Sequence, residues 1–250
     1  MLNKEKILAV IPAAGRGSRL GLNTPKALIR PDGKRTLIEM MHEKVTDLVD
    51  QVVYVINPTM LNHEDWPKLG EIETVVQEEP TGMGDAIFCA ADLIADSSVI
   101  VVVWADQYGI SQGTLQRALL KHKSRNSNSP KFTIPLIEVE NPYVEYNFSG
   151  RSIKSISQKR EGDKTSESGL TDVGCFILDA GQPLLEAWRS HLSEINTGEL
   201  THERNFLPFL AWLSIHDWEL EIVEAKPSDR AGINTIEDFK SAQRDYGSNE

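Results

Sequence analysis

The sequence predicts an α/β protein with a doubly wound, mostly parallel sheet. Short apolar runs alternate with amphipathic helical patterns through the first half of the chain, as in consecutive strand–helix–strand units. Residues 99–104 are six apolar residues without polar alternation, which is typical of a parallel strand covered on both faces. Thr36 and Glu39 form a capping-box pattern, which marks the start of the first helix.

The first half of the chain supplies four expected strands and three expected helices. The strands are expected at residues 7–11, 52–56, 71–77 and 99–104, and the helices at 36–49, 82–95 and 112–123. Pro12 ends the first strand, and Asn57-Pro58 ends the second. In the first helix Leu37, Met41 and Val45 recur at helical spacing.

The second half is less regular. Strands are expected at 132–139, 152–157, 172–178 and 219–225, and helices at 182–195, at 202–214 and after an N-cap at Thr235. Pro208 is expected to kink or split the helix at 202–214, and residues 160–169 are expected to form a polar loop. Because no repeat or long linker interrupts the chain, we expect one domain over residues 1–250, with residues about 130–200 forming a small α+β lobe.

Composition excludes several classes of protein. The chain has 250 residues and a net charge of −11, so neither nucleic acid nor an anionic membrane is expected as its main partner. Its two cysteines, Cys89 and Cys175, are far apart, which argues against a disulfide framework and a zinc site. No stretch approaches the roughly 20 apolar residues of a membrane span. We therefore expect a cytoplasmic protein, and a homo-oligomer remains open.

The segment after the first strand is the most informative one for function. Residues 13–20 read AAGRGSRL and are followed by Pro25-Lys26; small residues and glycines let a backbone approach a ligand with its N–H groups exposed. Four basic residues and no acidic one lie between positions 16 and 31, namely Arg16, Arg19, Lys26 and Arg30. Exposed N–H groups with convergent cations favour a polyphosphate ligand. The segment lacks the Walker A pattern, and Leu20 stands where a Rossmann fingerprint has its third glycine.

These motifs resemble the signature of the sugar-phosphate nucleotidylyltransferase family, the pyrophosphorylases with a nucleotide-diphospho-sugar transferase fold. The resemblance extends over residues about 7–240 and is of the MobA-like or uridylyltransferase-like kind of NTP transferase domain. It implies a Rossmann-like sheet with an acceptor lobe. It also implies transfer of a nucleoside monophosphate from an NTP to a small phosphorylated metabolite, with release of pyrophosphate.

The resemblance also implies roles for individual residues. Arg19, Lys26 and Lys159 would be catalytic: the first two would hold the triphosphate, and Lys159, after Gln158, would hold the acceptor phosphate. Asp106 and Asn234 would bind Mg²⁺, which accepts a carboxylate and an amide oxygen and keeps several waters. The nucleotide-binding residues would be Ala13, Ala14, Gly15, Arg16, Gly17, Ser18, Gln77, Gly82 and Asp85, with Gln77 reading the base.

The residues themselves support this arrangement. Ligands of open α/β sheets bind beyond the carboxyl ends of the strands, where residues 13–26 and Asp106 are expected. A phosphate monoester is mostly dianionic at pH 7, so its attack on the α-phosphorus of an NTP needs no general base, only positioning and charge neutralisation.

Three departures from the family pattern leave the acceptor open. Trp104 and Ala105 replace the small glycine that often precedes the metal-binding Asp, and Asp85 stands where the uridylyltransferases have His. Asp172-Val173-Gly174 stands where a sugar-reading Asn-x-Gly is expected.

We expect a pyrimidine NTP, UTP or CTP, and a sugar 1-phosphate as acceptor. A cytidylyltransferase for a non-sugar phosphate, such as a phosphocholine-like molecule, is the main alternative, and a molybdopterin-type nucleotidyltransferase is another. A GT-A-type glycosyltransferase is more distant, because Gln107 and Tyr108 follow Asp106 where that class has a DxD motif. A binding module without catalysis is the remaining alternative.

Overall fold

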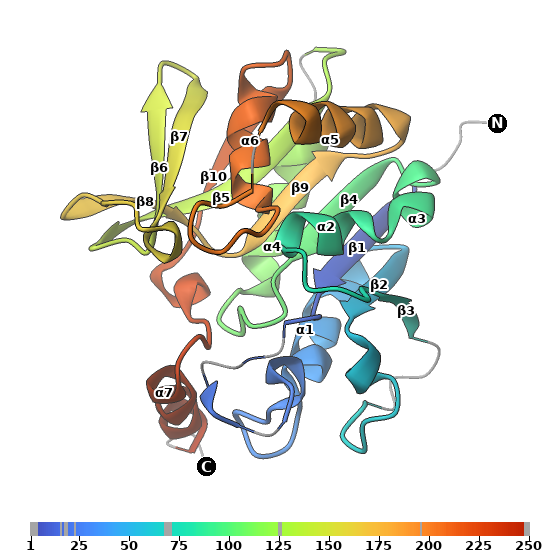
Figure 1. Ribbon diagram of the computed structural model, residues 1–250, viewed down its shortest axis with the longest axis vertical. Coiled ribbons are helices and arrows are strands. Elements are labelled where there is room, and N and C mark those ends of the chain that lie inside the picture. The colour runs from blue at the N-terminus through green and yellow to red at the C-terminus, as the bar shows by residue number, and fades with distance from the viewer. Residues whose placement is uncertain are drawn as a thin grey trace.

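The computed structural model of the chain describes residues 5–15, 17, 20–22, 24–67, 72–124, 127–195 and 197–247. Within them an eight-stranded, mostly parallel sheet separates two layers of helices (Figure 1). The main path of the sheet runs in the order β10-β5-β9-β4-β1-β2-β3, and β8 pairs with β5. Its strands are β1 Ile7–Pro12, β2 Gln51–Ile56, β3 Glu73–Val76, β4 Val99–Val103, β5 Lys131–Glu140, β8 Ser168–Asp172, β9 Cys175–Asp179 and β10 Glu219–Glu224.

Parallel pairing dominates. β1 is parallel to β2 and β4, β2 is parallel to β3, and β5 is parallel to β10. β9 runs antiparallel between β4 and β5, and β8 pairs antiparallel with the other half of β5. The predicted Rossmann-like α/β fold is therefore confirmed, with two antiparallel strands added.

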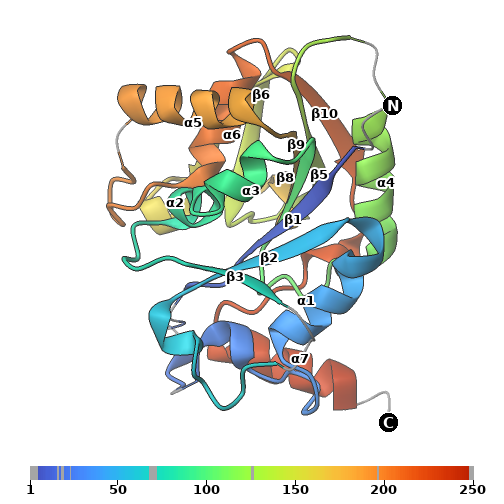
Figure 2. The ribbon, with the colours of Figure 1, turned by 90° about the vertical axis from the view of Figure 1, so that its right-hand side faces the viewer.

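Alternation along β1 explains the two helical layers. Leu8 and Val10 lie in a core shared with α2, α3, α5 and α6, whereas Ile7, Ala9 and Ile11 lie in a core shared with α1 and α4. Figure 2 shows these layers on opposite faces of the sheet. The helices are α1 Leu37–Val45, α2 Met83–Phe88, α3 Ala91–Ala95, α4 Gln112–Lys123, α5 Gln182–Glu194, α6 Phe206–Ser214 and α7 Ile236–Gly247.

A third, smaller core brings distant parts of the chain together. Leu20, Ile29 and Leu37 pack there with Ile233 and with Ala242 of α7. The long connection between β1 and α1 therefore lies against α7, below the carboxyl ends of the central strands (Figure 2).

The structure corrects several predicted boundaries. The helix expected at 82–95 is two helices, α2 and α3, and the strand expected at 172–178 is divided between β8 and β9. The division lies at Gly174, which has a φ of 70° and donates its N–H to Asp172 Oδ1 at 2.8 Å. α6 begins at Phe206, so Pro208 lies in its first turn, where a missing N–H removes no helical hydrogen bond.

Two features between residues 140 and 170 were not predicted. β6 Val144–Ser149 and β7 Ser152–Gln158 form a separate two-stranded antiparallel sheet, of which only β7 was expected. The expected polar loop at 160–169 instead continues a short 3-10 helix, η5 Lys159–Glu161, and enters β8. Among the described residues, no helix has the length and apolarity needed to cross a membrane.

Glu161 fastens this region to the connection between α5 and α6. Its buried carboxylate accepts hydrogen bonds from the N–H groups of Leu200 (3.1 Å) and Thr201 (3.2 Å), the Thr201 hydroxyl (2.6 Å) and the Asn205 amide (2.9 Å). Burial alone raises the pKa of Glu161, but these hydrogen bonds outweigh it and lower the pKa to about 2.

A pH-dependent loss of stability follows. Because the pKa of folded Glu161 lies below its ordinary value of 4.5, its stabilisation is present above about pH 4.5 and is lost as the pH falls towards 2. Glu161→Gln is expected to lower the free energy of unfolding at pH 7 by about 1.5–3 kcal/mol. Urea denaturation of both proteins between pH 7 and pH 3 measures the difference, which should narrow below pH 4.5; a difference independent of pH would contradict the assignment.

Candidate active site

Three of the predicted site residues meet beyond the carboxyl ends of β1 and β4. The Lys26 ammonium forms an ion pair with Asp106 Oδ2 and donates a hydrogen bond to Asn234 Oδ1 at 3.0 Å. The side chains of Lys26 and Asp106 are 18% and 25% exposed, so a ligand can reach them while neighbouring groups shield part of their charge from water. These residues lie 80 and 208 positions from Lys26 in the chain.

Local structure fixes the position of Lys26. It begins the 3-10 helix η2 Lys26–Leu28, after Pro25, and Ala27 and Leu28 are buried behind it. Gly17, with a φ of 65°, packs against it: a Cβ at this glycine would lie 2.7 Å from Lys26 Cβ. A side chain at position 17 would therefore displace Lys26.

The segments that carry Asp106 and Asn234 are bound directly to each other. The N–H of Ile233 donates to the Asp106 carbonyl at 3.1 Å, and the N–H of Gly109 donates to the Ala231 carbonyl at 2.7 Å. Fully buried Asp229 accepts from the Thr114 hydroxyl at 2.7 Å and the Ser111 N–H at 2.9 Å. These bonds align the turn after β4 with the segment before α7.

Lys44 supports the same turn from α1. Its ammonium donates to the carbonyl of Tyr108, two residues after Asp106, and burial lowers the pKa of Lys44 to about 8. Burial raises the pKa of the Asp172 carboxyl, and the charge of Asp106 acts in the same direction. The Tyr146 hydroxyl donates to Asp172 Oδ2 at 3.1 Å.

The Gly-rich loop follows β1 as expected. The N–H of Ala13 donates to the Val55 carbonyl at 2.7 Å, and the Asn57 amide donates to the Ala14 carbonyl at 3.0 Å. Gly15 is exposed and has open space around its Cα. Arg16, Ser18 and Arg19, three of the predicted ligand-binding residues, lie outside the described residues.

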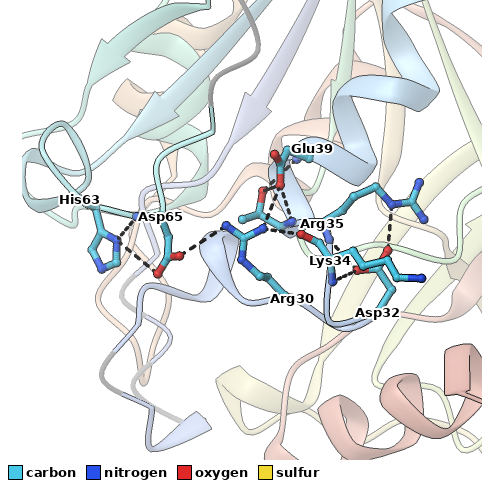
Figure 3. Close-up of polar contacts among 8 residues, drawn as sticks. Arg30, Asp32, Lys34, Arg35, Glu39, His63 and Asp65 are labelled. Carbon is cyan, nitrogen blue, oxygen red and sulfur yellow. Dashed lines mark hydrogen bonds and ion pairs between the residues drawn. The ribbon is translucent and has the colours of Figure 1, made fainter.

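Arg30 does not join Lys26 at the site. Its guanidinium lies 3.5 Å from Glu39 Oε2 and 3.4 Å from Asp65 Oδ1, as Figure 3 shows. Arg35, nearby, binds Asp32 at 2.8 Å. Arg30 therefore ties the connection after η2 to α1 and to the segment around Asp65, which a count of basic residues in the sequence could not reveal.

The predicted base-reading turn is held by internal contacts. Gln77 is buried, and its N–H donates to the carbonyl of Ile56 in β2 at 2.8 Å. Its side-chain amide donates to the Gly82 carbonyl at 3.1 Å. Asp85 forms an ion pair with Arg204 at 3.2 Å.

Lys159 lies at the end of β7 and is exposed. Its N–H donates to the Tyr143 carbonyl at 3.0 Å and its ammonium to the Asn141 carbonyl at 3.2 Å. Its ammonium makes no hydrogen bond or ion pair with Lys26, Asp106 or Asn234 among the described residues. Sequence reasoning did not identify Glu161 or Arg204, because neither lies in a local motif and their partners are distant in the chain.

Two cavities flank Arg204. One, of about 460 Å³, lies between the end of β7, α5 and the segment before α6, and is lined by Gln158, Asp163, Trp188 and Glu199 among others. The other, of about 440 Å³, is lined by Thr81, Asp85 and Trp188 together with Arg204. Both have the size of small-molecule sites.

The donor set at Lys26 suits a hard cation. Asp106 and Asn234 offer one carboxylate and one amide oxygen that converge on a single nitrogen atom. Magnesium accepts such oxygens and takes its remaining ligands from water and phosphate. Within the described ranges no three His, Cys, Asp or Glu side chains gather as a metal cluster, so a site held entirely by such side chains is not seen there.

Comparison with known proteins agrees with the geometry. The family of the MobA-like NTP transferase domain matches residues 9–163. The bifunctional protein GlmU of Buchnera aphidicola subsp. Acyrthosiphon pisum (strain Tuc7) is 27% identical over 202 residues, covering 78% of this chain and 42% of that protein.

Other GlmU proteins match at similar levels. That of Ruthia magnifica subsp. Calyptogena magnifica is 27% identical over 238 residues, covering 92% of this chain and 49% of that protein. That of Thermotoga sp. (strain RQ2) is 29% identical over 203 residues, covering 79% and 44%. The chain thus spans less than half the length of these relatives. Since the family match covers more than half of the chain, the protein belongs to the MobA-like NTP transferase domain family.

Proposed function

We propose that the protein transfers a nucleoside monophosphate from a pyrimidine NTP to a small phosphate monoester, preferably a sugar 1-phosphate, with Mg²⁺ and release of pyrophosphate. The observation that carries the proposal is the meeting of Lys26, Asp106 and Asn234 at the end of the sheet where the Gly-rich loop begins. A cation, two oxygen ligands and an exposed backbone are what a triphosphate with its metal requires.

The roles follow from chemistry and position. The Lys26 ammonium would bind the triphosphate and neutralise the charge that grows on the leaving pyrophosphate. Arg19 and the backbone of residues 13–18 would hold the same group. Asp106 and Asn234 would hold the Mg²⁺, which would neutralise phosphate charge during the transfer.

In the transfer, an acceptor phosphate oxygen forms the new bond to the α-phosphorus while the bond to the bridging oxygen of pyrophosphate breaks. The dianionic acceptor supplies its own electron pair, so no side chain has to remove a proton. This agrees with a group of proposed catalytic residues that contains no histidine.

Base and acceptor recognition are proposed from two further places. The Gln77 carboxamide lies beside the turn at Gly82. There it would hydrogen-bond the edge of a pyrimidine base, together with Asp85. Lys159 would hold the acceptor phosphate, and its neighbour Gln158 lines the cavity of about 460 Å³. Polar groups in that lining, such as Thr197 and Glu199, suit the hydroxyls of a sugar.

One observation favours a second candidate, a cytidylyltransferase for a phosphocholine-like acceptor. The same cavity combines the ring of Trp188 with the carboxylates of Asp163 and Glu199. The ring of Trp188 is stacked on Phe88 and His191, so the carboxylates are what favour a positively charged group such as a quaternary ammonium.

Loss of Lys26 tests the catalytic role. Lys26→Ala is expected to lower kcat by about 10²–10³ because one preorganised cation is removed, while circular dichroism stays unchanged. Pyrophosphate release measures the rate. Lys123→Ala, which removes a lysine of α4 that pairs with Glu5, is the matched control and should keep the wild-type rate. Near wild-type turnover in Lys26→Ala would disprove the assignment.

A nucleotide panel tests the substrates. With Mg²⁺, UTP or CTP at about 100 times its Kd should add about 2.7 kcal/mol to the apparent stability, and ATP and GTP should add less. Thermal unfolding ranks the nucleotides. Pyrophosphate release with the best NTP then compares sugar 1-phosphates with phosphocholine and phosphoethanolamine. A preference for a purine NTP, or turnover with none of these acceptors, would contradict the proposed specificity.

A further inference from the structure

The segment at residues 197–205, which connects α5 to α6, lies between two parts of the proposed site. On one side is the base-reading turn at residues 81–85, and on the other is η5, which begins at Lys159. Figure 1 shows the segment in orange between α2 and the lower end of the β6–β7 hairpin, and Figure 2 shows the same neighbours.

Backbone contacts join this segment to the base-reading turn. The Arg204 N–H donates to the Thr81 carbonyl at 2.8 Å, and the Gly84 N–H donates to the Arg204 carbonyl at 2.9 Å. Gly82 has a φ of 125°, and a Cβ there would lie 2.6 Å from Arg204 N. The backbone of Arg204 therefore shapes the turn, whatever its side chain does.

The carboxylate of Glu161 holds the other side of the segment, next to an ion pair between Arg160 of η5 and Glu203 at 3.5 Å. The four hydrogen bonds that Glu161 accepts come from Leu200, Thr201 and Asn205, and Asn205 is the next residue after Arg204. Gly198 also packs on this carboxylate, since a Cβ there would lie 2.6 Å from Glu161 Oε1. The segment is thus fixed to η5 by a buried group and fixed to the turn by its backbone.

The ion pair between Arg204 and Asp85 adds a weaker contact. The Arg204 side chain is 51% exposed, and exposed ion pairs stabilise little. The route from Glu161 to the turn therefore runs mainly through the hydrogen bonds to its carboxylate, of which the bond from Asn205 is buried, and through the peptide backbone.

We propose that Glu161 is a positioning residue for nucleotide binding: by anchoring residues 200–205 it fixes the turn at 81–85 relative to the Lys159 end of the acceptor lobe. This rests on the proposed function, because the turn is where the base is expected. Glu161 acts on the nucleotide only through the turn, although it also lines the cavity of about 460 Å³ proposed for the acceptor. Its loss acts through the turn, so it raises the KM for the NTP more than it changes kcat.

Hydrogen exchange read by mass spectrometry tests the connection without any substrate. In Glu161→Gln, amides of a peptide covering residues 78–88 should exchange about tenfold faster or more, because the Gly84 N–H loses the fixed Arg204 carbonyl. Glu194→Gln is the matched control. The carboxylate of Glu194 also joins α5 to α6, because it accepts a hydrogen bond from Trp212 Nε1 at 2.7 Å. Among the described residues it makes no hydrogen bond or ion pair with residues 197–205.

Kinetics then test the functional part. The KM for the NTP should rise about tenfold in Glu161→Gln, with kcat within about twofold of wild type and the control unchanged. Thr201→Val, which removes one of the four bonds, should move both measurements in the same direction by less, and it replaces Glu161→Gln if that variant does not fold.

Two outcomes would overturn the inference: faster exchange confined to residues 197–205 with 78–88 unchanged, or an unchanged KM for the NTP. A wild-type protein that releases no pyrophosphate from any NTP would instead overturn the proposed function. The exchange experiment would then still decide whether Glu161 fixes the turn.

Discussion

The contact of one ammonium group with two oxygens organises the proposed site. Lys26 reaches Asp106 and Asn234 from the connection that follows β1, and the three residues come from parts of the chain that are far apart in sequence. Each depends on a different structural support: the small core around Ile29 and Ile233 for Lys26, the end of β4 for Asp106, and the N-terminal turn of α7 for Asn234. A fold that failed to assemble any of these would leave a charged side chain without its partner.

Two buried carboxylates join the segments around the proposed site. Asp229 is fully buried and joins the start of α4 to the segment before α7, and Glu161 joins η5 to the connection between α5 and α6. Hydrogen bonds hold the carboxylate form of both, and the pKa of each is lowered although burial acts in the opposite direction. Because a buried carboxylate is costly when its donors are lost, such groups specify one arrangement of the segments around them.

Local patterns predicted most of the fold, and the family resemblance predicted Lys26, Asp106 and Asn234 as site residues. The central strands and α4 follow from apolar runs and helical spacing, and the capping box at Thr36 starts α1 as expected. Asp106 was expected at the site from its place after β4 together with the resemblance. The predictions that were wrong or missing concern features that an apolar run or a charge count does not show. The division at Gly174 comes from its positive φ and its bond to Asp172, which the apolar run that predicted one strand did not show. The role of Glu161 has no local pattern, because its partners lie about 40 residues away in the chain. The sequence placed Arg30 among the basic residues that favour a phosphate ligand, but in the structure it pairs with Glu39 and Asp65.

The proposed function requires the Lys26–Asp106–Asn234 group to bind the triphosphate and its metal. A crystal structure with the preferred NTP, as a non-hydrolysable analogue, and Mg²⁺ tests this most directly. Phosphate oxygens are expected within hydrogen-bond distance of Lys26 Nζ. The Mg²⁺ is expected to be bound by oxygens of Asp106 and Asn234. A triphosphate bound elsewhere on the molecule, or an Asp106 side chain turned away from the metal, would contradict it.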